Sequence, residues 1–156
     1  MTRMNILVPY DNSDHARNAL AKAVELCEGR ADAEIHVIEV AAPPQDLVYS
    51  SMNPALGRGA AGDQENFTDE IEKRINAEDD ELTAHIATLV EGFEGTLTAD
   101  VVYGVYTADT IIDEAKRRNC TMIAMGSRGL GALRGMLGSV SFAVLRGADI
   151  PVLIVK

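Results

Sequence analysis

Five short apolar segments alternate with longer segments of helical pattern along the 156 residues, and this alternation constrains the fold more than any other feature. Short apolar strands separated by helices are typical of a parallel sheet that is covered on both faces. Right-handed crossovers then give a doubly wound five-stranded α/β fold. The expected strands are 6–8, 34–40, 98–103, 121–125 and 151–155, and the expected helices follow Ser13 and span 66–91, 107–118 and 139–146.

The length fits a single domain over 1–156, since two domains would each fall below the common size. Ser13 and Thr107 precede helical patterns and are expected to act as N-caps. Gly29 is expected to end the first helix. Residues 45–63 are rich in Gly, Ala and Ser without periodicity, which predicts a flexible loop of unusual length.

The charge balance excludes some partners. A net charge of −10, from 24 acidic and 14 basic residues, argues against nucleic-acid binding and against anionic membranes. Residues 63–81 alone hold nine acidic and two basic residues, which is typical of a solvated helix face. A small anionic ligand stays possible, because a few backbone amides hold a phosphate whatever the net charge.

The cysteines and apolar runs bear on the compartment. Cys27 and Cys120 form no CxxC pair or metal-ligand cluster, and both are expected to be small core residues. The first apolar run is too short for a signal peptide, and no run approaches the roughly 20 residues of a membrane span. We therefore expect a cytoplasmic protein without a membrane anchor.

The most informative segment for function is residues 126–138, with five glycines between an expected strand and an expected helix. Glycine lets the backbone approach a ligand, and the start of the following helix favours phosphate. Arg128 and Arg134 could reach phosphate oxygens. The segment is neither a Walker A loop nor a dinucleotide fingerprint, because it lacks Gly-Lys-Ser/Thr and follows the fourth strand. A merely flexible connection is the alternative.

These segments together resemble the universal stress protein family. Residues 6–13, ILVPYDNS, are similar to the family's opening ILVPxDxS. Residues 125–129, MGSRG, and 137–141, LGSVS, resemble its late nucleotide loop, and 148–155, ADIPVLIV, resembles its closing strand. The resemblance implies an adenine nucleotide alpha hydrolase-like fold and, in the ATP-binding branch, the pattern Gly-x2-Gly-x9-Gly-Ser/Thr. Here eight residues rather than nine separate Gly129 from Gly138, so the loop is one residue short.

The resemblance also implies a set of site residues that bind ATP or another adenine nucleotide, with or without Mg²⁺. Asp11 matches the acid near the ribose and adenine, although it could instead only cap its own turn. Val40 matches the position whose backbone contacts adenine, and Pro9 and Tyr10 are expected to line the same cleft. The phosphates would meet the glycine loop and the following helix, through Gly126, Arg128, Gly129, Gly138, Ser139, Val140 and Ser141.

Several functions stay open on these residues. A nucleotide-binding regulatory module is the first hypothesis, and a slow ATPase or phosphotransfer enzyme is the second. A dimeric interaction protein that binds no nucleotide is the third. Asp11 is the only evident carboxylate in the expected pocket, and His15, His36 and His85 are interpreted as surface or structural residues, so rapid hydrolysis has little support. A response-regulator receiver would need an acidic pair that the chain lacks. The resemblance further implies a homodimer through the edge strand 151–155.

Overall fold

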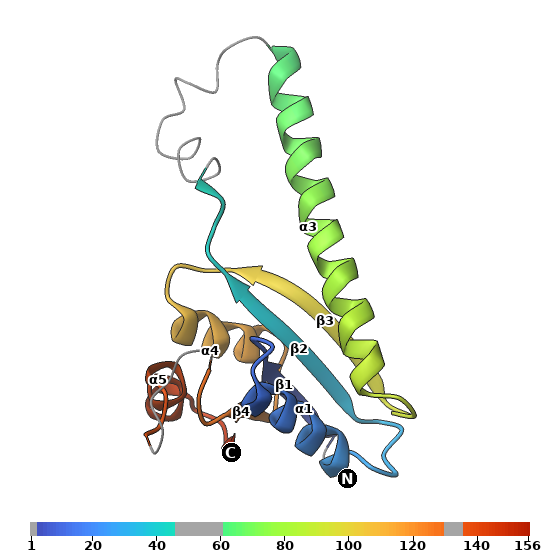
Figure 1. The fold of residues 1–156 in the computed structure, drawn as a ribbon, viewed down its shortest axis with the longest axis vertical. Coiled ribbons are helices and arrows are strands. Elements are labelled where there is room, and N and C mark those ends of the chain that lie inside the picture. The colour runs from blue at the N-terminus through green and yellow to red at the C-terminus, as the bar shows by residue number, and fades with distance from the viewer. Residues whose placement is uncertain (1–2, 46–60, 130–135) are drawn as a thin grey trace.

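The computed structural model describes residues 3–45, 61–129 and 136–156 (Figure 1). Its elements are β1 (Asn5–Pro9), α1 (Asp14–Leu26), β2 (Glu34–Ala41), α3 (Ala61–Leu89), β3 (Thr96–Tyr103), α4 (Thr107–Arg117), β4 (Met122–Gly126), α5 (Ser139–Gly147) and β5 (Val152–Val155). The strands form one parallel sheet in the order β3-β2-β1-β4-β5. The predicted doubly wound α/β fold is therefore confirmed, and the strand order reverses between β1 and β4.

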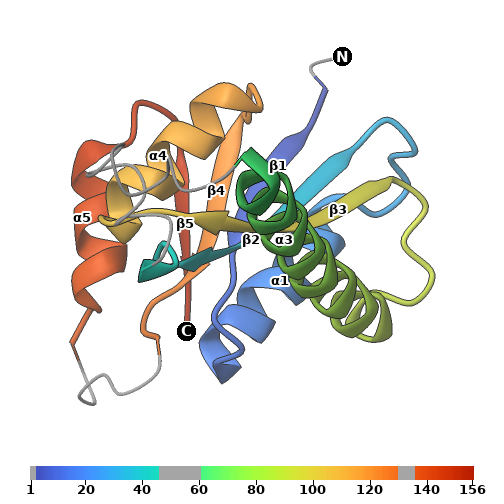
Figure 2. The ribbon, with the colours of Figure 1, turned by 90° about the horizontal axis from the view of Figure 1, so that it is seen from above.

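The two faces of the sheet carry separate cores, and β1 supplies both because its side chains alternate. Ile6, Val8 and Tyr10 pack with α1 and α3, while Leu7 packs on the opposite face with α4 and α5. Figure 2 shows α4 and α5 together on one side of the sheet. Cys27 belongs to the first core and Cys120 to the second, as expected of small core residues.

The helix ends test the capping predictions. Ser13 caps α1 as predicted, because its hydroxyl accepts a hydrogen bond from the amide of Ala16 at 3.2 Å. The prediction for Thr107 is wrong: Tyr106 is the N-cap of α4, without a side-chain cap bond, and Thr107 is the first helical residue. Helix α1 ends at Leu26, and Gly29 follows in the left-handed region with φ +70°.

Helix α3 begins earlier than predicted. Its first residue is Ala61 rather than a residue near 66, so the last part of the predicted 45–63 loop is helical. Residues 46–60 of that loop lie outside the described residues. The residue before Ala61 in the sequence is an alanine, which is not a capping residue, so no N-cap signal marks this helix start.

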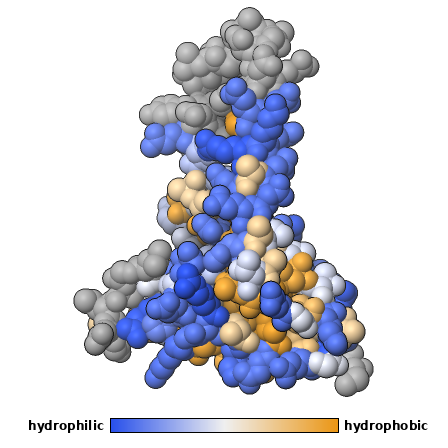
Figure 3. Space-filling model, turned by 45° about the vertical axis from the view of Figure 1, so that its right-hand side comes forward, coloured by the Kyte–Doolittle hydropathy of each residue, from blue (hydrophilic) through white to orange (hydrophobic). Residues whose placement is uncertain are grey.

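Helix α3 is held mainly through its second half. Leu82 and Ile86 are buried against the sheet, whereas the first half extends beyond the strands in Figure 1. Figure 3 shows that this extension is largely hydrophilic, in agreement with the solvated acidic face that the sequence predicts. None of the helices in the described part of the chain has the length and apolar character that a membrane crossing requires.

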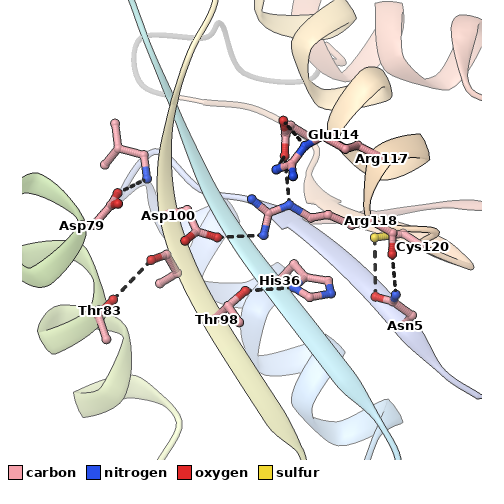
Figure 4. Close-up of polar contacts among 12 residues, drawn as sticks. Asn5, His36, Asp79, Thr83, Thr98, Asp100, Glu114, Arg117, Arg118 and Cys120 are labelled. Atoms are coloured by element: carbon pink, nitrogen blue, oxygen red, sulfur yellow. Dashed lines mark hydrogen bonds and ion pairs between the residues drawn. The ribbon is translucent and has the colours of Figure 1, made fainter. Parts of the chain in front are cut away.

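Side chains of α3 also cover the outer edge of β3. The amide of Val101 donates to Asp79 Oδ1 at 2.7 Å, and the hydroxyl of Thr83 donates to the carbonyl of Ala99 at 3.2 Å. These contacts, visible in Figure 4, satisfy backbone groups that an edge strand would otherwise offer to another chain.

A cluster of charged groups joins the end of α4 to β3 (Figure 4). Arg118 donates from Nη1 to Asp100 Oδ2 at 2.7 Å and from Nε to Glu114 Oε2 at 2.9 Å. The side chains of Arg118 and Glu114 are each only 12% exposed, so the pair is largely shielded from water. Beside them, His36 shares a hydrogen bond with Thr98, and burial lowers its pKa, with a further contribution from Arg118. His36 is thus a structural residue, as interpreted from the sequence.

Candidate functional site

A cleft of about 410 Å³ opens at the carboxyl ends of the strands, beside the reversal between β1 and β4. Doubly wound folds bind ligands at this place. All eleven residues expected from the sequence line it: Pro9, Tyr10, Asp11, Val40, Gly126, Arg128, Gly129, Gly138, Ser139, Val140 and Ser141. The structure thus brings together segments that lie far apart in the sequence, while their contact with a nucleotide stays a prediction.

The turn after β1 forms one wall of the cleft. Asp11 Oδ1 accepts a hydrogen bond from the amide of Ser13 at 3.1 Å, so the aspartate does shape its own turn. Asn12 follows in the left-handed conformation, with φ 61°, which asparagine tolerates better than most residues. The side chain of Asp11 is nevertheless part of the cleft lining, so the two interpretations of this residue are compatible.

The first turn of α5 forms the opposite wall. Its N-cap, Gly138, has no side chain to occupy the free amides of the turn. The amide of Gly138 itself donates to the carbonyl of Ser127 at 2.8 Å, which fixes the helix start against the end of β4. Ser141 adds a second tie, because its hydroxyl donates to the carbonyl of Gly126 at 2.8 Å. The amides left for an anion are therefore those of the first three helical positions, 139–141.

Two of the cleft glycines lie where an added Cβ would come within 3.0 Å of another residue. A Cβ at Gly126 would lie 2.7 Å from Cβ and 2.8 Å from the backbone carbon of His15, at the start of α1. A Cβ at Gly129 would lie 2.4 Å from Asp11 Oδ2. Glycine at 126 therefore permits helix packing, and glycine at 129 leaves the Asp11 carboxylate its place in the cleft.

Some lining residues were not expected from the sequence. Ala16, Ile38, Thr107, Ile111 and Met125 also line the cleft. The sequence pattern does not distinguish an apolar residue that lines a pocket from one in the core. It therefore marks Ile38, Ile111 and Met125 only as core residues. Thr107 could have been found, since it follows the end of β3 and so lies at the carboxyl edge of the sheet.

Among the described residues, few charged or titratable side chains lie at the cleft. His15 Nδ1 lies 3.5 Å from Ser127 Oγ, on the α1 side of the β4 end. Within the described ranges, no three His, Cys, Asp or Glu side chains gather closely enough to hold a metal ion. Arg134 and most of the shortened segment between Gly129 and Gly138 lie outside the described residues.

Comparison with known sequences gives matches along nearly the whole chain. The family model described as "Universal stress protein family" matches residues 2–156. The universal stress protein YxiE of Bacillus subtilis is 30% identical over 153 residues, with 97% of each protein covered. The universal stress protein MJ0531 of Methanocaldococcus jannaschii is 28% identical over 152 residues, covering 97% of this chain and 81% of that protein.

Comparison with solved structures supports the same fold. The hypothetical protein MJ0577 superposes with a TM-score of 0.72 at 24% identity, covering 100% of this chain and 97% of that one. A universal stress protein from Archaeoglobus fulgidus, solved in complex with dAMP, gives 0.56 at 24% identity with full coverage of both chains. Another universal stress protein, solved in complex with cAMP, gives 0.62 at 18% identity, covering 100% of this chain and 98% of that one.

Proposed function

Because this chain belongs to the universal stress protein family, we propose that its cleft binds an adenine nucleotide and that the protein is a nucleotide-binding regulatory module of the stress response. The observation that carries the proposal is the pairing of two features across one cleft. The first turn of α5, capped by a glycine, faces the Asp11 turn at the strand-order reversal. Relatives of the same fold that bind dAMP and cAMP support adenosine monophosphates as ligands, and ATP is the larger candidate.

The chemistry of the lining suits such a ligand. Val40 and Ile38 offer an apolar surface for a base at one end, and Asp11 offers a carboxylate that can accept hydrogen bonds from ribose hydroxyls. The first-turn amides of α5 and the Arg128 guanidinium would hold the phosphates at the other end. Since no three His, Cys, Asp or Glu side chains gather in the described part of the chain, any Mg²⁺ would be held mainly by the phosphates and water.

Nucleotide affinity tests the proposal directly. One sample of freshly purified protein is denatured, and the nucleotide that it releases is identified. A second, folded sample is freed of nucleotide and titrated with AMP and with ATP by calorimetry. Asp11→Ala should weaken binding by about 10- to 100-fold, because hydrogen bonds to a charged group contribute roughly 1.5–3 kcal/mol. Asp14→Ala, three residues along and 94% exposed in its side chain, is the matched control and should bind like the parent.

Two outcomes would contradict this function. Protein that carries no nucleotide and gives no heat with AMP or ATP would favour a dimeric interaction protein without a ligand. Multiple turnovers of ATP with release of phosphate would favour the enzyme hypothesis, whereas retention of intact ATP supports the regulatory module.

We also propose a homodimer joined at β5. β5 is the edge of the sheet opposite β3, and α3 side chains already occupy the β3 edge. The carbonyls of Pro151 and Val155 accept hydrogen bonds from the amides of Ile123 in β4 and of Ser127 directly after it. The backbone groups of the alternate residues Val152 and Ile154 therefore point to the free side. We propose, separately, a cytoplasmic location. Cys27 and Cys120 are both free and buried, and free thiols are typical of a reducing compartment such as the cytoplasm.

Particle mass tests the dimer. Light scattering of the purified protein at micromolar concentration should give twice the 16.7 kDa chain mass. Particles of a single chain mass across this concentration range would overturn the dimer without affecting the nucleotide proposal.

A further inference from the structure

Tyr10 connects the cleft to the opposite face of the sheet. Its amide bonds to the carbonyl of Ile38 at 2.8 Å, and the residue contributes to the cleft wall. Its side chain, only 3% exposed, belongs to the core under α1 and α3, on the face away from α4 and α5. There the hydroxyl lies 2.9 Å from Nε2 of His85 on α3, and the two rings pack with centroids 5.8 Å apart.

The same hydroxyl also fixes the turn that carries Asp11. It donates to Asn12 Oδ1 at 3.2 Å, and Arg17 Nη2 donates to this oxygen at 2.7 Å. A tyrosine hydroxyl has a single proton, so while it donates to Asn12 it can only accept from His85. The imidazole must then present Nε2–H as the donor. His85 therefore sets the direction of the hydrogen bond from Tyr10 to Asn12, which is the residue of this turn in the left-handed conformation.

The geometry points to His85 as a positioning residue for the nucleotide cleft, acting through Tyr10 on the Asp11–Ser13 turn. This inference deepens the proposed function, on which its ligand-dependent part rests. Because coupling between two sites is reciprocal, a nucleotide that selects the ordered turn also stabilises the attachment of α3 around His85. Nucleotide binding in the cleft would thereby affect the acidic helix α3 on the opposite face of the sheet.

Three variants separate this role from simple packing. His85→Phe keeps a ring against Tyr10 and removes the donor, whereas His85→Gln restores an amide N–H at a similar reach. Tyr103→Phe is the matched control, because the Tyr103 hydroxyl also bonds to α3, at Glu78, and the residue is not among those that line the cleft.

Hydrogen exchange of the ligand-free protein gives the first readout. In His85→Phe the amides of residues 12–16 should exchange about 3- to 10-fold faster, as expected when one hydrogen bond of ordinary strength is lost. His85→Gln and Tyr103→Phe should exchange like the parent in this turn. Unchanged exchange in His85→Phe, or equal acceleration in Tyr103→Phe, would overturn the inference whether or not any nucleotide binds.

AMP gives the second readout. Saturating AMP should slow hydrogen exchange over residues 82–89 in the parent and in Tyr103→Phe. In His85→Phe this slowing should be absent, and the Kd for AMP should rise roughly 3- to 10-fold. A parent that binds neither AMP nor ATP would refute the proposed function alone. AMP binding of parental affinity in His85→Phe, with the slowing kept, would refute the positioning role alone.

Discussion

Replacing Gly126 with alanine is expected to lower the free energy of unfolding by about 1–3 kcal/mol, the usual cost of overpacking a closed contact. The new Cβ would lie within 3.0 Å of Cβ and backbone atoms at the start of α1, and backbone atoms cannot rotate away as a flexible side chain can. Helix α1 would have to shift from the end of β4. Thermal unfolding of the nucleotide-free protein should show Tm falling by about 3–10 °C.

Gly138→Ala is the control for this prediction. Its Cβ would meet its nearest neighbour at 3.4 Å, an ordinary contact, and the φ of −63° suits alanine. Alanine caps a helix less well than glycine, which lowers stability, but it loses less conformational entropy on folding, which raises stability. The two effects oppose each other, so Tm should change by about 1–2 °C at most. Equal losses in the two variants would mean that the contact with α1 does not set the requirement for glycine at 126.

Replacing Arg118 with methionine is expected to cost about 2–4 kcal/mol, because it leaves Asp100 and Glu114 without their shielded partner. Methionine keeps much of the apolar length of the side chain, so the loss reports the charge rather than a cavity. Chemical denaturation at neutral pH, with the slope on denaturant concentration checked for constancy, measures this change.

Arg117→Met is the matched control, since Arg117 bonds to the same Glu114 but its side chain is 64% exposed. Its loss should stay at or below about 1 kcal/mol, as is usual for ion pairs in water. If the two variants lose equal stability, burial does not decide the strength of these ion pairs.

The pH dependence of the Arg118 variant follows from Glu114. Hydrogen bonds from Arg117 and Arg118 lower the pKa of this carboxyl below its ordinary 4.5, against the opposing effect of burial. A lowered folded-state pKa adds stability that is complete above 4.5 and disappears as the pH falls through the folded value. The difference in the free energy of unfolding between the parent and Arg118→Met should therefore become smaller as the pH falls below about 4.5. A difference in unfolding free energy that stays constant down to about pH 2 would contradict this role of Glu114.

Most of the fold was predictable because the strands are short apolar runs with clear ends. The strand 6–8, for example, is bounded by polar Asn5 and by Pro9, and the structure extends it only to those two residues. Helix boundaries were less predictable where no turn chemistry marks them. The start of α3 at Ala61 has no cap signal, and the cap at Tyr106 rather than Thr107 depends on how the chain leaves β3.

The cleft was predictable where backbone chemistry dictates the residue. Glycines and a helix start leave a mark in the sequence, and the aspartate after β1 was expected from the family resemblance. The structure places all of them at one cleft. Contacts that depend on tertiary packing leave none. The amide of Gly138 was expected to face a phosphate, yet it bonds to Ser127, and the Tyr10 side chain turns away to His85.

The unlike edges of the sheet have a consequence for the architecture of an assembly. If two copies join at β5, their sheets form one continuous surface with a β3 strand at each extreme. At roughly 4.8 Å between strands, the two β3 strands would be separated by about 43 Å. Each extreme would then carry an acidic α3, so the dimer would have the same charged helix at both ends and the two clefts between them. Such a particle could engage two partners at once without either one obstructing the other.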